Sequence, residues 1–165
     1  EIFAFLKSEK VITNDSYGIY GHSAGSQFAH RLALFTASKN ASIFIAANAG
    51  WYTTVDFDEP FPYGLKNAPI NENQLIEKFK YPITILLGEN DTDPNDSSLR
   101  KTEQAMRQGV HRFDRGNFFY NMAKDKADQL GVTFNWRLQT VPEVGHSNTK
   151  IAPIAAQIFI SSLND

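Results

Sequence analysis

The segment that most constrains the fold is YGIYGHSAGSQF, residues 17–28, where a short apolar run leads into the pentapeptide GHSAG and then into a helical pattern. Such a sharp strand-to-helix turn leaves no space for a side chain at Gly21 or Gly25. Ser23 is therefore expected at the tip of the turn, with its hydroxyl directed away from the sheet. The N–H of Ala24 opens the helix, where negative charge is favoured. This context is typical of a nucleophilic serine.

Two later segments supply residues that could activate such a serine. The run PITILLGENDTDP ends a buried strand pattern at Gly88 and places Asp91 just beyond it. The run WRLQTVPEVGHS places His146 in a loop before the last helix. A serine hydroxyl needs a base to take its proton, and His146 is the candidate for that role. Asp91 would hold the imidazole in the correct tautomer.

On GHSAG, LLGENDTD and VGHS, the chain resembles an α/β-hydrolase of the serine esterase and lipase kind, from about residue 11 to the end. The order serine, acid, histidine along the chain is the order of that family. The stretches ANAGWYT, FPYGL and QGVHRFDRG are similar to bacterial hydrolases described as esterases. The resemblance implies a triad of Ser23, Asp91 and His146, an oxyanion donor at the N–H of Ala24, and cleavage of a carboxylic ester through an acyl-enzyme. It implies no metal and no organic cofactor.

Other histidines are weaker candidates for the base. His22 lies inside the turn with its side chain expected to point away from Ser23, His30 lies on the following helix, and His111 lies in a charged loop. We expect these three to be surface or supporting residues.

The acid has two competitors in its own loop, Asp93 and Asp96. Asp91 follows Gly88 at the offset that the family uses, whereas Asp93 reads as a turn or helix-cap residue. The run DTDPND resembles the start of a calcium loop, but Asp96 stands where glycine is required and Thr102 where glutamate is required. We therefore expect Asp91 as the acid and no calcium site.

Strand and helix patterns alternate along the chain, which predicts an α/β fold with three layers, α/β/α, and a mostly parallel sheet. We expect one domain over residues 1–165. We expect Pro153 to lie in the first turn of the last helix, and we expect the first helix to have an apolar side. Predicted strands cover 17–21, 42–47, 83–87 and 132–140, and predicted helices cover 1–9, 24–37, 74–79, 97–107, 117–130 and 151–163.

Residues 48–82 interrupt this alternation and are rich in aromatic residues, proline and glycine. In the family this is the position of a cap or pocket wall, so the segment could line a substrate pocket. The alternative is that its aromatic residues pack the loop against the body of the domain. The candidate pocket residues are Trp51, Tyr52 and Phe61, with Phe57 and Tyr63 beside them.

Composition narrows the possible partners. The net charge of −2 is spread along the chain without a basic block, which argues against nucleic acid. No apolar run is long enough to cross a bilayer, and the absence of cysteine excludes disulfides and a cysteine nucleophile. Arg107, Arg112 and Arg115 could bind a substrate carboxylate or pair internally with Glu103 and Asp114, and the internal role is expected.

The resemblance covers only the C-terminal part of an α/β-hydrolase, because strands that precede the nucleophile strand in the family have no counterpart. The HGGG-type motif that carries the second oxyanion donor is also missing. We therefore expect strand 17–20 to lie at an unpaired sheet edge, and the fold to be completed by an N-terminal part or a complementary chain.

Two other functions fit the same residues. A serine peptidase of this fold would use the same triad. A non-catalytic relative could keep the fold and bind a ligand with its aromatic segment, although such a protein has no physical need for all three triad residues.

Overall fold

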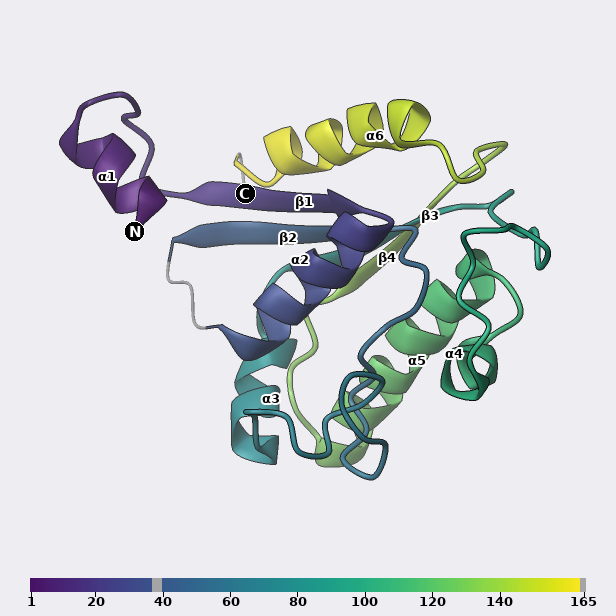
Figure 1. Cartoon of the computed structure of the whole chain (residues 1–165). Helices are drawn as coiled ribbons and strands as arrows, with labels where there is room; N and C mark the ends of the chain where they lie inside the picture. The colour runs from purple at the N-terminus through teal and green to yellow at the C-terminus, as the bar shows by residue number, and fades with distance from the viewer. Residues whose placement is uncertain (37–39, 164–165) are drawn as a thin grey trace.

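The computed structural model describes residues 1–36 and 40–163. Its four parallel strands form one sheet in the order β1-β2-β3-β4, with helices on both faces (Figure 1). The predicted three-layer α/β/α class is therefore confirmed. The strands are β1 (Tyr17–His22), β2 (Ala41–Ala47), β3 (Ile83–Gly88) and β4 (Arg137–Val141). The helices are α1 (Ile2–Ser8), α2 (Ala24–Phe35), α3 (Glu72–Phe79), α4 (Glu103–Gln108), α5 (Arg112–Leu130) and α6 (Asn148–Ser161).

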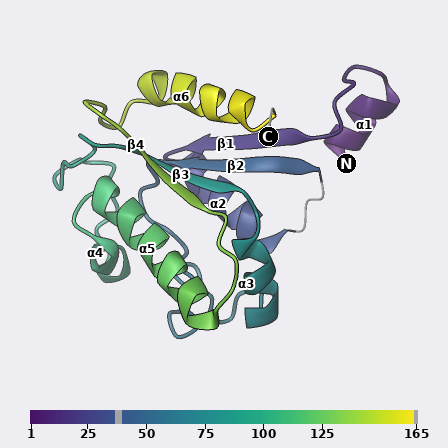
Figure 2. The same cartoon turned by 180° about the vertical axis from the view of Figure 1, so that it is seen from behind.

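The two central strands are buried on both faces, which explains their nearly continuous apolar sequence. Successive side chains of a strand point to opposite faces. Phe44 and Ile85 accordingly join the core beneath α2 and α5, whereas Ile45 and Leu86 join the core beneath α6. Figure 2 shows the same layers from behind, with α6 alone on its face of the sheet. Both cores fix the sheet on which the site is built.

Strand β1 lies at the edge of the sheet, as expected from the sequence. Within the described residues it pairs only with β2, from Tyr17 opposite Ala41 to His22 opposite Ala47. The strand that leads to Ser23 therefore has one hydrogen-bonded neighbour in this chain.

Two helices differ from their predicted bounds because polar side chains cap them. The helix expected at 97–107 begins later, since the Thr102 side chain caps the first turn of α4. The helix expected at 117–130 begins earlier, because His111 Nδ1 accepts a hydrogen bond of 3.2 Å from the N–H of Asp114 and caps α5. His111 is thus an N-cap residue, a role that histidine seldom has.

The strand expected at 132–140 is shorter at its start. Phe134 packs against the core outside the ladder, and the N–H of Asn135 donates to the carbonyl of Phe79 instead of to β3. Hydrogen bonding to β3 therefore begins only at Arg137.

The terminal helices also differ from expectation. Helix α6 begins before the predicted 151, so Pro153 lies inside it and not in its first turn. Helix α1 buries no residue, and the predicted apolar side leaves Ile2 and Phe5 78% and 62% exposed. Helix α2 ends at Phe35, and residue 37 of the predicted helix lies outside the described residues.

Candidate active site

Ser23 sits between the end of β1 and the start of α2 in a backbone conformation that few residues adopt. Its φ of 56° and ψ of −116° are strained for a residue with a Cβ, and its N–H donates to the carbonyl of Ala47 at 2.9 Å. Gly21 makes the turn possible, because a Cβ there would lie 2.0 Å from the carbonyl oxygen of Gly25. The same expectation for Gly25 is wrong, since a Cβ on Gly25 would meet no described atom within 4 Å apart from its chain neighbours and the backbone of its own helix.

The structure brings Ser23, Asp91 and His146 together from three separate segments. His146 Nε2 lies 3.0 Å from Ser23 Oγ, and His146 Nδ1 lies 2.7 Å from Asp91 Oδ2. A carboxylate only accepts hydrogen bonds, so Nδ1 carries the proton and Nε2 is left to accept from the serine hydroxyl. The arrangement is thus a chain of hydrogen bonds from carboxylate to imidazole to hydroxyl.

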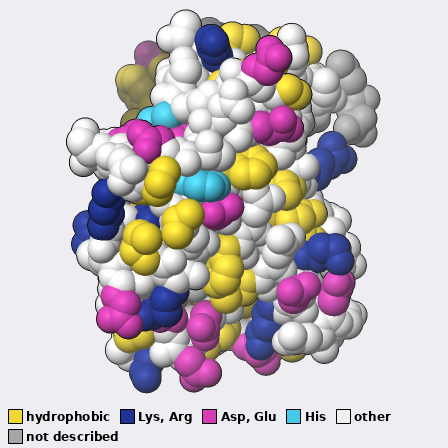
Figure 3. Space-filling view, turned by 90° about the vertical axis from the view of Figure 1, so that its right-hand side faces the viewer, with side chains coloured by type: hydrophobic (Ala, Val, Ile, Leu, Met, Phe, Trp, Pro, Cys, Tyr) yellow, Lys and Arg dark blue, Asp and Glu magenta, His cyan; other side chains and the backbone are white. Residues whose placement is uncertain are grey.

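The three hydrogen-bonded side chains lie at the carboxyl edge of the parallel sheet, where ligands bind in open α/β folds. Asp91 is 4% exposed and His146 is 23% exposed, so the acid is shielded while the imidazole reaches the surface. Figure 3 views the molecule from this edge and shows histidine side chains among hydrophobic ones. The geometry allows a substrate to approach the serine and the imidazole from outside.

The two other aspartates of the acid loop have structural partners. Asp93 Oδ1 accepts from the N–H of Asn95 at 2.8 Å, so Asp93 forms the expected turn. Hydrogen bonds from Arg112 and Ser98 hold the pKa of Asp96 well below its usual range. Neither carboxylate is bonded to His146, so only Asp91 is placed to orient the imidazole.

Arg112 supports the acid, a role that the sequence did not single out. Its side chain is 2% exposed, and Nη1 lies 3.4 Å from Asp91 Oδ1 and 3.0 Å from Asp96 Oδ2. Nη2 donates to Ser98 Oγ at 2.8 Å. Of the other arginines considered, Arg107 pairs with Glu103 and also with Glu59. The expected internal pairing therefore holds for Arg107, whereas Arg112 meets the carboxylates of the acid loop. Arg115 is also internal, but it donates to the carbonyls of Gly109 and Gly50 and not to a carboxylate.

Asn48 was also missed by sequence reasoning. It follows β2 with a φ of 48°, and its side chain is fully buried. Its Oδ1 accepts from the N–H of Gly88 at 2.9 Å, and its Nδ2 donates to the carbonyl of Gly145 at 3.3 Å. Asn48 thus ties the end of the strand before Asp91 to the residue before His146. A polar residue directly after a buried strand was the only sequence signal for it.

The remaining histidines do not contact Ser23 Oγ. The ring of His22 packs on the ring of His146, with centroids 4.7 Å apart, and does not point away as expected. Burial, and next the electrostatic interaction with His146, lower the pKa of His22 to about 4. His30 is fully buried; its Nε2 accepts from the N–H of Thr53 at 3.0 Å, and its Nδ1 donates to the carbonyl of Ser26 at 2.8 Å.

We expect His30 to make stability depend on pH. Burial lowers its pKa in the folded state to about 3, against an ordinary value of 6.5. Below pH 6.5 His30 becomes protonated in the unfolded chain but stays neutral in the folded chain. The free energy of unfolding therefore falls by about 1.4 kcal/mol per pH unit toward pH 3. Urea unfolding of the full-length protein between pH 7.5 and 4.5 would measure this slope. His30→Gln should reduce the slope, although the lowered pKa of His22 still contributes, and an unchanged slope in that variant would contradict the assignment.

The three candidate pocket residues lie in different surroundings. Tyr52 is fully buried and stacks on Phe119, with centroids 4.7 Å apart, so it packs the segment against the body of the fold. Trp51 is 8% exposed and contacts Tyr63. Phe61 is 47% exposed. The structure therefore does not gather these three into one pocket within the described residues.

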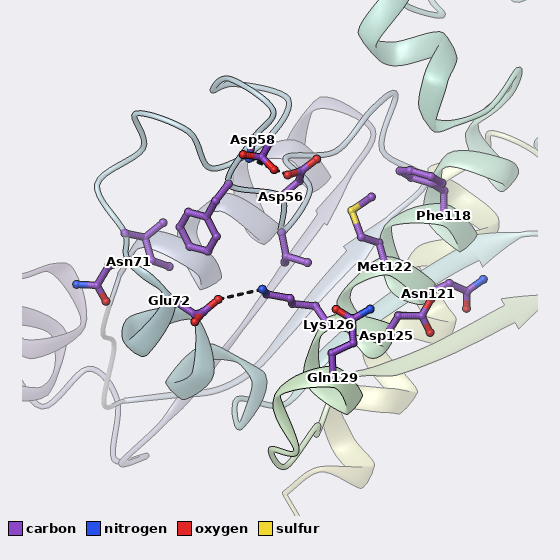
Figure 4. Close-up of a pocket in the computed structure, with 13 residues that line it drawn as sticks. Asp56, Asp58, Asn71, Glu72, Phe118, Asn121, Met122, Asp125, Lys126 and Gln129 are labelled. Carbon is purple, nitrogen blue, oxygen red and sulfur yellow. Dashed lines mark hydrogen bonds and ion pairs between the residues drawn. The ribbon is translucent and has the colours of Figure 1, made fainter.

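A separate groove of about 870 Å³ lies between α5 and the loops around residues 55–58 and 70–72 (Figure 4). Its walls combine Phe118 and Met122 with carboxylates, of which Glu72 pairs with Lys126 at 2.9 Å. None of Ser23, Asp91 and His146 lines it. Within residues 1–36 and 40–163, no group of acidic and histidine side chains could hold a metal ion, and no helix is long and apolar enough to cross a membrane.

Comparison with known proteins points to hydrolases. No protein-family model and no curated protein matches the chain. Poly(aspartic acid) hydrolase-1 from Sphingomonas sp. KT-1 is 42% identical with a TM-score of 0.91, over 94% of this chain and 59% of that one. LpqC, a poly(3-hydroxybutyrate) depolymerase from Bordetella parapertussis, is 33% identical with a TM-score of 0.91, over 97% of this chain and 54% of that one.

A third solved structure, siderophore hydrolase EstA from Aspergillus nidulans, is 17% identical with a TM-score of 0.51, over 99% of this chain and 52% of that one, and shows a likeness of fold alone. The chain thus spans little more than half the length of the solved chains it matches. The described residues form part of the fold that these proteins share.

Proposed function

Since the chain belongs to the α/β-hydrolase superfamily, we propose that it is the part of a serine hydrolase that carries the nucleophile, the base and the acid, and that the enzyme cleaves carboxylic esters. The observation that carries the proposal is the hydrogen-bonded series from Asp91 through His146 to Ser23. The two similar structures above 30% identity are both hydrolases, one of them a depolymerase of a polyester.

The reaction follows from the positions of these atoms. His146 Nε2 accepts the proton of Ser23 Oγ as the oxygen attacks the ester carbonyl carbon. His146 then gives this proton to the departing alcohol oxygen as the carbon–oxygen bond breaks, which leaves an acyl-enzyme. A water molecule, deprotonated by the same imidazole, releases the acid and restores the serine. Asp91 stays ionised throughout and stabilises the imidazolium.

The negative charge on the carbonyl oxygen needs donors that do not move during the reaction. The N–H of Ala24, at the start of α2, is the donor that this chain provides. A second donor comes from residues outside this chain, in keeping with the share of the similar structures that the chain spans. Loss of one such donor lowers turnover by about 100- to 1,000-fold, so the full-length protein is the proper material for kinetics.

Covalent labelling tests the proposal. A fluorophosphonate is expected to label Ser23 in the full-length protein, with the modified peptide identified by mass spectrometry. The variant Ser23→Ala should not be labelled and should not hydrolyse a nitrophenyl ester, whereas Ser26→Ala, one turn along the same helix, should still be labelled. Absence of label in the native protein, or labelling at another serine, would refute the assignment.

Amide hydrolysis is the second candidate, favoured by the 42% identical poly(aspartic acid) hydrolase. The same triad can attack an amide, but the departing amine must be protonated by His146 before the bond breaks. Rates on a nitrophenyl ester and on the corresponding anilide distinguish the two. A comparable kcat/KM on both substrates would assign the amide.

A further inference from the structure

Arg31 of α2, Trp51 after β2 and Arg100 form a cluster around one aromatic ring. The guanidinium of Arg31 lies 4.3 Å from the centre of the Trp51 ring, and that of Arg100 lies 5.6 Å from it. Tyr63 packs on Trp51 with ring centroids 4.5 Å apart. Arg31 Nε donates to Thr53 Oγ1 at 2.9 Å. Stacking and this hydrogen bond hold the Arg31 guanidinium in place, and we refer to these groups as the Arg31–Trp51–Arg100 cluster.

Short stretches of sequence separate this cluster from the nucleophile and from its hydrogen-bond partner. Ala47 at the end of β2 accepts the N–H of Ser23, and Trp51 follows four residues later. Arg31 lies eight residues after Ser23 and therefore about 12 Å along α2, because a helix rises 1.5 Å per residue. Helical side chains lean toward the N-terminus, so that of Arg31 leans toward Ser23. The cluster thus lies within reach of a substrate whose carbonyl is at Ser23.

The cluster carries positive charge that this chain does not balance. Among residues 1–36 and 40–163, neither Arg31 nor Arg100 forms an ion pair, whereas Arg107 and Arg112 each meet two carboxylates. Arg100 Nε donates to the neutral hydroxyl of Tyr63 at 2.6 Å. An anion bound beside either guanidinium would supply the counter-charge that the described residues do not provide.

One donor atom of Arg31 also lacks a hydrogen-bond partner among the described residues. This atom is Nη2, and it is buried. Burial also lowers the pKa of Arg31, which reflects the cost of keeping its charge away from water. A partly buried cation without a counter-charge carries a desolvation cost, and a ligand with a carboxylate would supply both the counter-charge and the acceptor.

We propose that the Arg31–Trp51–Arg100 cluster binds a carboxylate of the substrate, on a part of the substrate remote from the bond that is cleaved. The planar guanidinium matches a carboxylate in shape and charge. The inference rests on the proposed function and narrows it to an acidic substrate long enough to span from Ser23 to Arg31.

Paired substrates test the inference in the full-length protein. One is the mono-nitrophenyl ester of sebacic acid, a long dicarboxylic acid with a free carboxylate at its far end. The other is the same compound with that carboxylate converted to its methyl ester. The native enzyme should prefer the charged substrate by about tenfold or more in kcat/KM, mainly through a lower KM, and added salt should weaken the preference.

Matched variants locate the effect. Arg31→Gln should remove most of the preference, and Arg31→Lys should retain part of it because the charge remains. Arg100→Gln should lower the preference less, since Arg100 is exposed. The control Arg107→Gln removes the same charge from a paired arginine and should leave the preference unchanged.

Fluorophosphonate labelling of Ser23 in each variant separates the two proposals. If Ser23 of the native protein fails to react, the proposed function falls. If Ser23 reacts but the native enzyme shows no preference for the charged ester, only the carboxylate site falls. The site is also overturned if Arg31→Gln slows both substrates equally while labelling stays normal, because Arg31 would then have a structural role.

Discussion

Replacement of Asp91 by Asn is expected to lower kcat/KM on an ester by about 10⁴-fold without unfolding the protein. The asparagine Oδ1 can still accept from Arg112, so the buried position keeps one of its partners. An amide facing His146 Nδ1 favours the tautomer that is protonated at Nε2. That nitrogen could then no longer accept the proton of Ser23, so the loss should fall mainly on kcat.

The same loop provides a matched control for this experiment. Asp93 is exposed, and its interaction with the N–H of Asn95 can also be made by an asparagine side chain. Asp93→Asn should therefore leave kcat/KM within about twofold, as is usual for surface changes. Equal losses in both variants would show that the charge of the loop, and not the orientation of His146, supports the reaction.

Gly21→Ala is expected to cost more than about 3 kcal/mol of folding stability, at the upper end of overpacking costs. The added Cβ would lie 2.0 Å from the carbonyl oxygen and 2.3 Å from the carbonyl carbon of Gly25. These are backbone atoms of the first turn of α2, which cannot rotate aside as a side chain can. Urea unfolding of the full-length protein would measure the difference in free energy of unfolding.

Gly25→Ala serves as the counterpart on the other side of Ser23. Apart from its chain neighbours and the backbone of its own helix, a Cβ there meets no described atom within 4 Å, and alanine is a better helix former than glycine. Stability should stay within about 1 kcal/mol of the native protein. If Gly25→Ala proved as damaging as Gly21→Ala, the turn would be packed differently from the structure described above.

The sequence predicted the part of the site that depends on strand ends. Runs of branched apolar residues located β2 and β3, because strands covered on both faces must be apolar throughout. The ends of parallel strands lie along one edge, so residues just past them were expected to meet. Ser23, Asp91 and His146 do lie within hydrogen-bond distance there. Whether they act as a catalytic triad stays a prediction.

Other features could not be predicted, because they depend on contacts between distant residues. The start of α5 is set by His111, a cap that composition does not suggest. The support that Arg112 gives to Asp91 requires that helix to begin against the acid loop. The two hydrogen bonds of Asn48 join β2 to segments that are 40 and 97 residues away. Such partners become visible only when the strands are in place.

The two hydrogen bonds of Asn48 bear on two properties of the molecule, namely the placement of Asp91 and His146 and the shape of the surface around them. Among the described residues, the aromatic insertion that follows β2 forms no direct hydrogen bond with Asp91 or His146, which are positioned by strand ends and the buried amide of Asn48. New side chains at exposed positions of the insertion, such as Phe61, can therefore alter what is recognised while the reacting atoms keep their spacing.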